Sequence, residues 1–291
     1  MPGLCDSRRV NPESPAMPQT FATTDGLMLV YDDQGSGTPL LCLAGLTRNM
    51  ADFETVLPLA DRLRLIRLDS RGRGASDHDP DPANYTIAHE AADVLALLDH
   101  LGLPRVAILG TSRGGLIAMA LAVQHRHRLT GVLLNDIGPV IEPEGLAAIR
   151  DYIGIRPRHA DYDQAATGLQ RFHAAGFPGV PLPVWRVFAR RIYLQAADGL
   201  DLRYDPALRV NVLAAAGPAA DLWPLFSALA GLPVAVLRGA NSNLLSAATL
   251  AEMIRRHPGL IAATVPDRGH VPFLDEPASV ALIDAFVAAL P

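Results

Sequence analysis

Hydrophobic residues along this chain come in short continuous runs that alternate with longer amphipathic stretches. From residue 39 onward the runs are PLLCLAGL, LRLIRLDS, RVAILGTS, LTGVLLNDIG, PVAVLRG and LIAATVPD. Short runs this apolar are typical of strands that are buried on both faces of a parallel sheet. Their alternation with helical stretches predicts an α/β fold, with a mostly parallel sheet covered by helices on both faces.

Two amphipathic stretches predict well-defined helices on the sheet. In TIAHEAADVLALLDHLG the apolar positions share one helical face, and Gly102 stands where a helix C-cap belongs. In EPASVALIDAFVAALP, Pro277 occupies a favourable first helical position, and apolar residues recur from Val280 to Leu290 at helical spacing. The chain is therefore expected to end with a helix docked on the core.

The N-terminal part predicts a leader followed by a hairpin. Residues 1–19 are rich in Pro, Ser and Arg, which is typical of a flexible segment. TFATTDGLMLVYDDQG predicts two antiparallel strands that turn near Asp25–Gly26, because glycine supplies the positive φ of a tight turn. An antiparallel edge of this kind fits a mainly parallel sheet.

Residues 139–226 interrupt the alternation of strands and helices. EPEGLAAIRDYIG, DQAATGLQRFHAAG and VWRVFARRIYLQAADG all have helical spacing, and Pro-rich joints separate them. Most of the aromatic residues lie here, where they form either the core of a small helical layer or the wall of an apolar pocket, with Trp185 and Tyr152 as candidate substrate contacts. We predict a leader at 1–19, a core made of 20–138 and 227–291, and a helical cap at 139–226 inserted after the sixth strand.

Composition and charge exclude several classes of function. The formal net charge is -5 without a cluster of Lys or Arg, so the chain lacks the electrostatic footprint of a nucleic-acid binder. No segment reaches the ~18 apolar residues of a membrane helix, and the N-terminus lacks the apolar core of a secretion signal, which predicts a cytoplasmic protein. Cys5 and Cys42 form neither a disulfide framework nor a metal-ligand pattern.

The most specific chemical signal is ILGTSRGGLIAMALA, an apolar strand followed by Gly110-Thr111-Ser112-Arg113-Gly114 and a helix of small residues. This is a G-x-S-x-G pattern in the strand-turn-helix context that a serine nucleophile requires. The glycines leave room that a Cβ would fill, and the helix N-terminus favours negative charge near the reacting oxygen. Ser112 is therefore the candidate nucleophile.

From about residue 20 to its end the chain resembles the cap-bearing, esterase-like members of the α/β-hydrolase superfamily. Besides the Ser112 turn, the resemblance rests on LLCLAGLTRN, LDSRGRGASD and DRGHVPFLDEP, which occur in the superfamily's order. In the first of these, Ala44 stands where the family usually has His. The resemblance implies that His270 is the base and that the backbone N–H groups of Leu46 and Arg113 form the oxyanion hole.

A serine nucleophile and its histidine base normally form a catalytic triad with an acid that orients the histidine. The sequence leaves the identity of this acid open. By resemblance it is expected in RGANSNLLS, but position 243 holds Asn, which carries no charge to stabilise an imidazolium. Asp136 in LLNDIGP could supply the carboxylate from the end of the sixth strand, Asn243 could form a weakened triad, or no acid acts. Asp267 is a weaker candidate, because a sequence neighbour seldom reaches the far nitrogen of the imidazole.

The expected function is a serine hydrolase that uses neither metal nor cofactor and cleaves a carboxylic ester, a lactone or a thioester through an acyl-enzyme. Its partner is then a small-molecule ester, and the side chains of Arg48 and Arg113 could meet a negatively charged substrate. Two alternatives stay open: carbon–carbon bond hydrolysis on the same fold, and a ligand-binding protein with weakened turnover. The sequence does not decide between a monomer and a homodimer.

Overall fold

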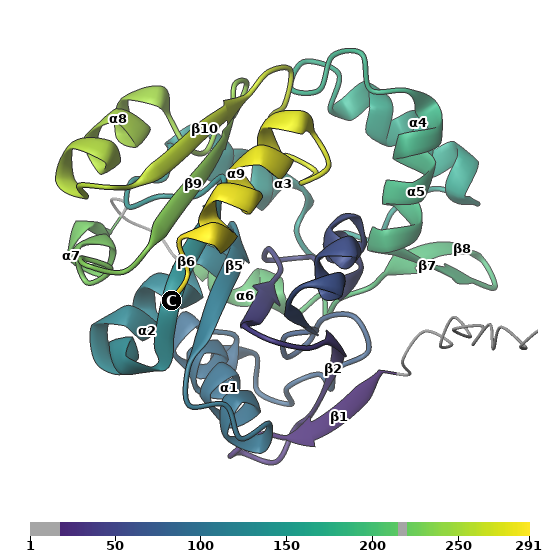
Figure 1. Ribbon diagram of the computed structural model, residues 1–291. Helices are drawn as coiled ribbons and strands as arrows, with labels where there is room; N and C mark the ends of the chain where they lie inside the picture. Colours follow the sequence, from purple (N-terminus) through teal and green to yellow (C-terminus); the bar gives the residue numbers. More distant parts are fainter. Residues whose placement is uncertain (1–17, 215–219) are drawn as a thin grey trace, which may run out of the picture.

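The centre of the molecule, seen in a computed structural model that describes residues 18–214 and 220–291, is an eight-stranded sheet (Figure 1). The strand order is β1-β2-β4-β3-β5-β6-β9-β10, antiparallel at β1-β2 and β2-β4 and parallel from β4 onward. The sequence prediction of a mostly parallel sheet with an antiparallel edge is confirmed. The strands are β1 Gln19–Ala22, β2 Met28–Gly35, β3 Pro39–Leu43, β4 Arg64–Leu68, β5 Val106–Thr111, β6 Leu129–Asn135, β9 Val234–Gly239 and β10 Ile261–Val265.

The antiparallel edge forms as a hairpin because its turn contains the required glycine. β1 pairs with β2 in a register that places Ala22 opposite Met28. Gly26, in the turn between them, has a φ of 92°, a backbone conformation that side chains with a Cβ rarely adopt. The predicted turn at Asp25–Gly26 is therefore confirmed, and the predicted leader lies outside the described residues except for its last two positions.

The strands of the parallel part bury both of their faces. Along β3, Leu41 and Leu43 belong to one apolar cluster, whereas Leu40 and Cys42 belong to another, as the period of two in a strand requires. The first cluster contains residues of α1, α2, α7 and α8, and the second contains residues of η1 and α9. Helices therefore cover both faces, with α1 Ile87–His100, α2 Arg113–His125, α7 Trp223–Ser227, α8 Ala247–Arg256, α9 Pro277–Ala288 and the 3₁₀ helices η1 Met50–Asp61, η2 Pro82–Asn84 and η3 Arg126–Arg128.

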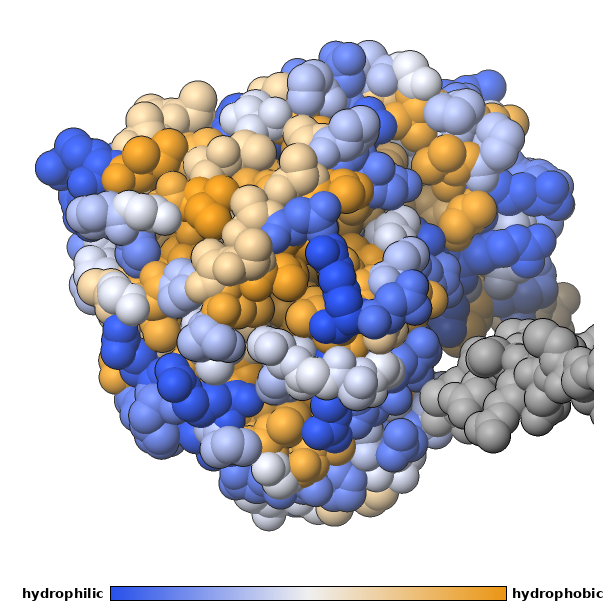
Figure 2. All heavy atoms as spheres, in the orientation of Figure 1, coloured by the Kyte–Doolittle hydropathy of each residue, from blue (hydrophilic) through white to orange (hydrophobic). Residues whose placement is uncertain are grey.

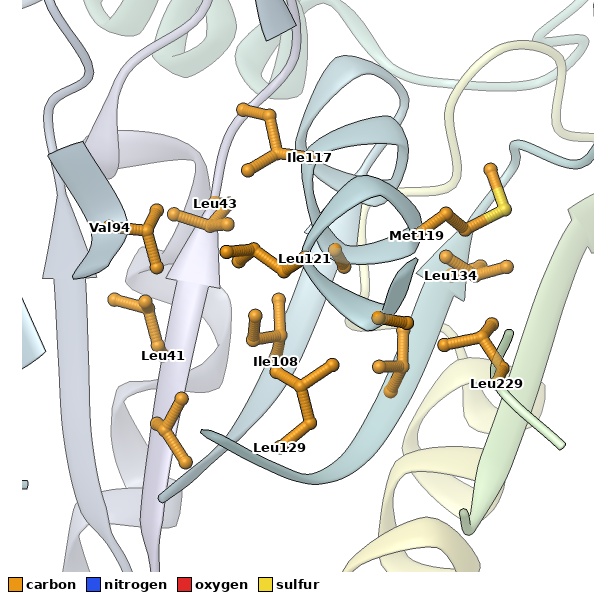
Figure 3. Packing of buried hydrophobic residues seen from close by; sticks show 14 of the residues in the cluster. Leu41, Leu43, Val94, Ile108, Ile117, Met119, Leu121, Leu129, Leu134 and Leu229 are labelled. Carbon is orange, nitrogen blue, oxygen red and sulfur yellow. The ribbon is translucent and has the colours of Figure 1, made fainter. Parts of the chain in front are cut away.

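Helix α2, which follows the candidate nucleophile, packs directly on the middle strands. Figure 3 shows Ile117 and Leu121 of this helix next to Leu43 and Ile108 of β3 and β5. Full burial of an aliphatic side chain contributes roughly 1.5–3 kcal/mol. The N-terminus of α2 is therefore fixed to the carboxyl edge of the sheet.

The last helix is present as predicted, and on its expected apolar face Ile283 is buried while Val287 and Leu290 pack against the same cluster. Val280, expected on the apolar face, is 45% exposed, whereas Leu282, Ile283 and Phe286 are buried against the sheet. Figure 2 shows apolar side chains gathered over α9 on the outer surface. Because the helix is apolar on most of its circumference, the spacing of its hydrophobic residues did not distinguish the exposed Val280 from the buried Leu282 and Phe286.

Between β6 and β9 the chain forms a layer of helices and one small hairpin. The helices are α3 Pro143–Tyr152, α4 Tyr162–Phe172, α5 Leu182–Ile192 and α6 Leu208–Ala214, and the hairpin joins β7 Tyr193–Ala196 to β8 Gly199–Leu202. The expectation of one helix through VWRVFARRIYLQAADG is wrong after Ile192. Asp198-Gly199 is a turn signal, Gly199 has a φ of 128°, and the preceding residues pair as a strand.

The limits of the cap, 139–226, stay a prediction. Helix α7 begins inside that interval at Trp223, but Phe226 belongs to the same apolar cluster as α2 in the core. Within the described residues, no helix combines the length and apolar character needed to cross a bilayer. The predicted cytoplasmic location stays a prediction as well.

Candidate active site

Ser112 lies in a strained turn between β5 and α2. Its φ is 50° and its ψ is -112°, a conformation that is costly for a residue with a Cβ. The turn closes only because its neighbours are small: a Cβ on Gly110 would lie 2.6 Å from Gly114, and a Cβ on Gly114 would lie 2.1 Å from the carbonyl oxygen of Leu43. The geometry holds the Ser112 hydroxyl at the edge of the sheet, next to the helix N-terminus.

His270 comes from the loop after β10 and meets Ser112 across 158 residues of sequence. Its Nε2 lies 3.0 Å from the Ser112 Oγ, and its Nδ1 lies 2.7 Å from the Asp136 Oδ2. A hydroxyl in contact with one ring nitrogen and a carboxylate in contact with the other is the arrangement that a nucleophile, a base and an orienting acid require. The three residues come from the carboxyl ends of β5, β6 and β10.

The Asp136 carboxylate is held in place by two further donors. The side chain is completely buried, its Oδ1 accepts a hydrogen bond from the Gly239 N–H at 2.7 Å, and its Oδ2 accepts one from the Ser242 hydroxyl at 2.6 Å. Hydrogen bonds from N–H and O–H groups compensate a buried carboxylate for the water that it loses. Asp136 therefore satisfies the geometric requirement of a triad acid.

Asn243 lies in the same loop as Ser242 but does not reach His270 in the described structure. Its backbone carbonyl faces α3, so that a Cβ on Gly145 would lie 2.8 Å from this oxygen. No side-chain hydrogen bond of Asn243 occurs within the described residues. Of the two residues proposed for the acid, the structure brings Asp136, and not Asn243, to the imidazole.

The predicted oxyanion-hole residues flank the nucleophile. A Cβ on Gly45 would lie 3.6 Å from the Cβ of Ser112, so the loop after β3 that carries Leu46 packs against the serine. Arg113 follows Ser112 directly as the first residue of α2. Throughout 18–214 and 220–291, neither the Leu46 N–H nor the Arg113 N–H has a hydrogen-bond acceptor. Both donors are therefore available to an oxygen atom next to Ser112.

A cavity of about 450 Å³ opens above Ser112 and His270 and extends beneath the helical layer. Ile155 and Phe172 line it and are 49% and 67% exposed, which places them at its mouth. Within the part of the chain that the structure describes, no group of three or more His, Cys, Asp or Glu side chains is placed to hold a metal ion. The other lining residues are Gly45, Leu46, Thr47, Arg48, Thr111, Ile149, Tyr152, His159, Gly168, Leu169, His173, Phe177, Trp185, Phe188, Ile192, Tyr193, Leu202, Tyr204, Val271 and Phe273.

A family model described as the alpha/beta hydrolase fold matches residues 38–277, which include the Ser112 turn, Asp136 and His270. The chain belongs to this family. The structure agrees with this assignment, because the chain has the mostly parallel sheet and the flanking helices that the resemblance implies. Membership supports a hydrolytic enzyme.

Three proteins similar to this α/β hydrolase match it over most of its length. It is 36% identical over 267 residues to 3-hydroxybutyrate-oligomer hydrolase of Cupriavidus necator, covering 88% of this chain and 90% of the relative. It is 30% identical to 2-(acetamidomethylene)succinate hydrolase of Mesorhizobium japonicum, covering 82% and 83%. A crystal structure of an α/β hydrolase from Novosphingobium aromaticivorans superposes with a TM-score of 0.90 at 38% identity, covering 95% of this chain and 99% of that one.

Of the four side chains expected to contact substrate in this α/β hydrolase, three line the cavity and one does not. The three are Arg48, Tyr152 and Trp185. Arg48 is also paired with Asp52, at 2.7 Å from its Nε, and its guanidinium lies 4.0 Å from the centre of the Phe188 ring. The expectation that the Arg113 side chain could meet an anionic substrate is wrong, because this side chain turns away from the cavity and binds Glu90.

Sequence reasoning missed three residues of the site. Ser242 donates to the Asp136 carboxylate, Glu90 binds the arginine that follows the nucleophile, and His173 stacks on Trp185 with ring centroids 5.1 Å apart. Ser242 stands next to Asn243, so the loop after β9 does contact the acid, through a hydroxyl. Glu90 had a weak sequence signal as the acidic residue in the first turn of an amphipathic helix, and His173 had none.

His173 is expected to make the enzyme sensitive to acid. Burial and the charge of Arg48 lower the pKa of His173 to about 4, against about 6.5 in an unfolded chain. Below pH 6.5 the unfolded chain binds a proton at His173, whereas the folded chain does so only near pH 4. The free energy of unfolding is therefore unaffected by the titration of this residue above pH 6.5 and decreases as the pH falls toward 4. Between pH 7 and pH 5 we expect the free energy of unfolding of the wild type to fall by about 1–2 kcal/mol more than that of His173→Gln.

Urea unfolding at the two pH values measures this difference. His127→Gln, a change at an exposed histidine, is the matched control and should keep the pH dependence of the wild type. Equal pH dependence for the wild type and His173→Gln would contradict the assignment.

Proposed function

We propose that this chain is a serine hydrolase that cleaves carboxylic esters through an acyl-enzyme. The observation that carries the proposal is the continuous contact from Ser112 through His270 to Asp136, with distances of 3.0 Å and 2.7 Å. A serine hydroxyl is a weak nucleophile at neutral pH and needs a base in hydrogen-bond reach, which this arrangement supplies. The strained turn and the free N–H groups beside it are the further requirements of acyl transfer.

In the first half of the proposed reaction, the Ser112 Oγ attacks the ester carbonyl while the His270 Nε2 takes the hydroxyl proton. The carbonyl oxygen becomes an oxyanion that accepts hydrogen bonds from the Leu46 and Arg113 N–H groups. The Asp136 carboxylate holds the ring in the tautomer that leaves Nε2 free and stabilises the imidazolium. Collapse of the intermediate expels the alcohol, which receives the proton from His270, and leaves the acyl group on Ser112.

In the second half, water replaces the alcohol. His270 takes a proton from the water, the hydroxide attacks the acyl carbonyl, and the acid is released as the Ser112 Oγ regains its proton.

We propose esters of short hydroxy acids, including oligomers of 3-hydroxybutyrate, as the substrate class. The relative of that name supports this class through 36% identity over most of both chains. A cavity of about 450 Å³ offers room for more than one such unit. Aromatic side chains form much of its wall, while Thr47, Tyr152, His159 and His173 provide polar groups for ester carbonyl and hydroxyl oxygens.

Hydrolysis of the 3-hydroxybutyrate dimer and trimer, measured by chromatography of the released acid, tests this class against p-nitrophenyl butyrate. We expect the enzyme to cleave all three. Cleavage of only the p-nitrophenyl ester would remove the substrate class and keep the ester hydrolase. Cleavage of none would remove both.

Release of 3-hydroxybutyrate in the same assay would exclude both alternatives left open by the sequence. A ligand-binding protein was considered because position 243 lacks a carboxylate, and Asp136 now stands at the imidazole in its place. Such a protein would bind the oligomers without releasing 3-hydroxybutyrate. A carbon–carbon bond hydrolase would leave the oligomers intact.

A further inference from the structure

A buried charged cluster lies beneath the two segments that carry the proposed oxyanion hole. It consists of Arg73, Glu90 and Arg113, and we call it the oxyanion clamp. Arg73 and Glu90 are only 1% and 2% exposed, and the Arg113 side chain is 15% exposed. Charged side chains are almost never buried to this extent unless they are paired, so the cluster calls for a structural or functional reason.

The oxyanion clamp is connected to both segments by direct hydrogen bonds. On one side, the Arg73 Nε donates to the backbone carbonyl oxygen of Leu46 at 2.9 Å. On the other side, the Nε and an Nη of Arg113 donate to both carboxylate oxygens of Glu90 at 2.8 to 3.0 Å. Glu90 Oε1 also accepts from an Nη of Arg73 at 3.0 Å, which closes the chain of contacts from Leu46 to Arg113.

The two segments come from different parts of the sheet. Leu46 follows β3, and Arg113 begins α2, so their N–H groups converge on one point only if loop and helix are held at a fixed distance. Glu90 lies on α1, which packs against α2. We propose that Glu90 is a positioning residue that aligns the two oxyanion donors, holding Arg113 directly and Leu46 through Arg73. This inference rests on the proposed ester hydrolase.

The electrostatics of the cluster favour this role. Burial opposes ionisation of Glu90, but the charges of Arg73 and Arg113 outweigh burial and hold its pKa below the usual range. The carboxylate is therefore charged at neutral pH and binds both guanidinium groups strongly. Two salt-bridged arginines on one buried carboxylate leave little freedom for the backbone groups attached to them.

The chain contains a matched control on the same helix. Asp93 is also a 2% exposed carboxylate of α1 and also pairs with a buried arginine, Arg71, at 2.6 and 2.7 Å. Its partners are Arg71 and, through it, Asp25 and Asp79, with no hydrogen bond to Leu46 or Arg113 in the described structure. Asp93→Asn therefore perturbs a buried ion pair of the same kind and leaves in place the side chains that bind Leu46 and Arg113. Among the described residues, its one hydrogen-bonded link to the oxyanion clamp is the backbone carbonyl of Arg71, which accepts from an Nη of Arg73 at 2.6 Å.

The test compares Glu90→Gln with Asp93→Asn by steady-state kinetics on p-nitrophenyl butyrate, thermal unfolding, and inhibition by an aryl trifluoromethyl ketone. The ketone forms a tetrahedral adduct whose oxygen occupies the proposed oxyanion hole. Loss of one well-placed oxyanion donor costs about 10²–10³ in kcat, so a misaligned donor in Glu90→Gln should lower kcat about tenfold to 100-fold with little change in KM. The inhibition constant of the ketone should rise by the same factor.

Asp93→Asn should lower Tm at least as much while keeping kcat and the inhibition constant of the ketone near wild type. If Glu90→Gln does not fold, Arg113→Gln removes the same contact from a less buried position and should give the same losses, with partial recovery in Arg113→Lys. Folded variants of Glu90 or Arg113 with unchanged kcat, or with lower kcat and an unchanged ketone constant, would overturn the clamp alone. A wild-type enzyme that neither cleaves p-nitrophenyl butyrate nor is inhibited by the ketone would instead remove the ester hydrolase, and the clamp with it.

Discussion

Replacing Ser112 with alanine is expected to lower kcat for p-nitrophenyl butyrate by roughly 10⁴-fold or more, because no other hydroxyl is in contact with His270 in the described structure. The substitution removes one oxygen atom and keeps the backbone of the turn. Since the φ of Ser112 is 50°, alanine keeps the same strain, and Tm should change little. Steady-state kinetics and thermal unfolding of the purified variant check both statements.

Ser227→Ala provides the control for this experiment. Ser227 is an exposed residue at the end of α7, and its replacement should leave kcat unchanged. A Ser112→Ala variant that keeps more than a tenth of the wild-type kcat would remove the nucleophile from the account.

The second large effect is expected at the acid. Asp136→Asn should lower kcat by about 10⁴-fold, since an amide favours the wrong imidazole tautomer and carries no charge to stabilise the imidazolium. Asn243→Asp should leave kcat within about twofold, because residue 243 does not contact the ring. The combination of both changes should be as slow as Asp136→Asn alone. Kinetics of the three variants decide between the two positions.

Thermal unfolding must accompany these measurements, because Asp136 also binds the Gly239 N–H and the Ser242 hydroxyl. A folded Asp136→Asn that keeps its rate, together with a faster Asn243→Asp, would move the acid back to the loop after β9.

Much of the fold could be predicted because it depends on local patterns. The buried strands, the hairpin at Gly26 and the turn around Ser112 each have a signal within a dozen residues. The hairpin of β7 and β8 was missed because the preceding helical spacing was carried past Asp198-Gly199, although that pair is itself a turn signal. On α9 the outward position of Val280 was missed, since the sequence of this helix is apolar on most sides.

The site was less predictable where it depends on contacts between distant segments. Ser112 and His270 have local motifs, and the structure brings them together. The choice between Asp136 and Asn243 depends on how the ends of β6 and β9 lie relative to the imidazole, which no local pattern encodes. The direction of the Arg113 side chain depends on Glu90, which lies 23 residues earlier on another helix.

Covalent labelling with a fluorophosphonate is the direct test of Ser112 as the nucleophile, because the reagent reacts with an activated serine and adds a measurable mass to it. We expect one adduct per chain, located by peptide mapping on Ser112, absent in Ser112→Ala and formed much more slowly in His270→Ala and Asp136→Asn. An adduct on a different residue, or ester hydrolysis by a wild-type enzyme that takes up no label, would contradict it.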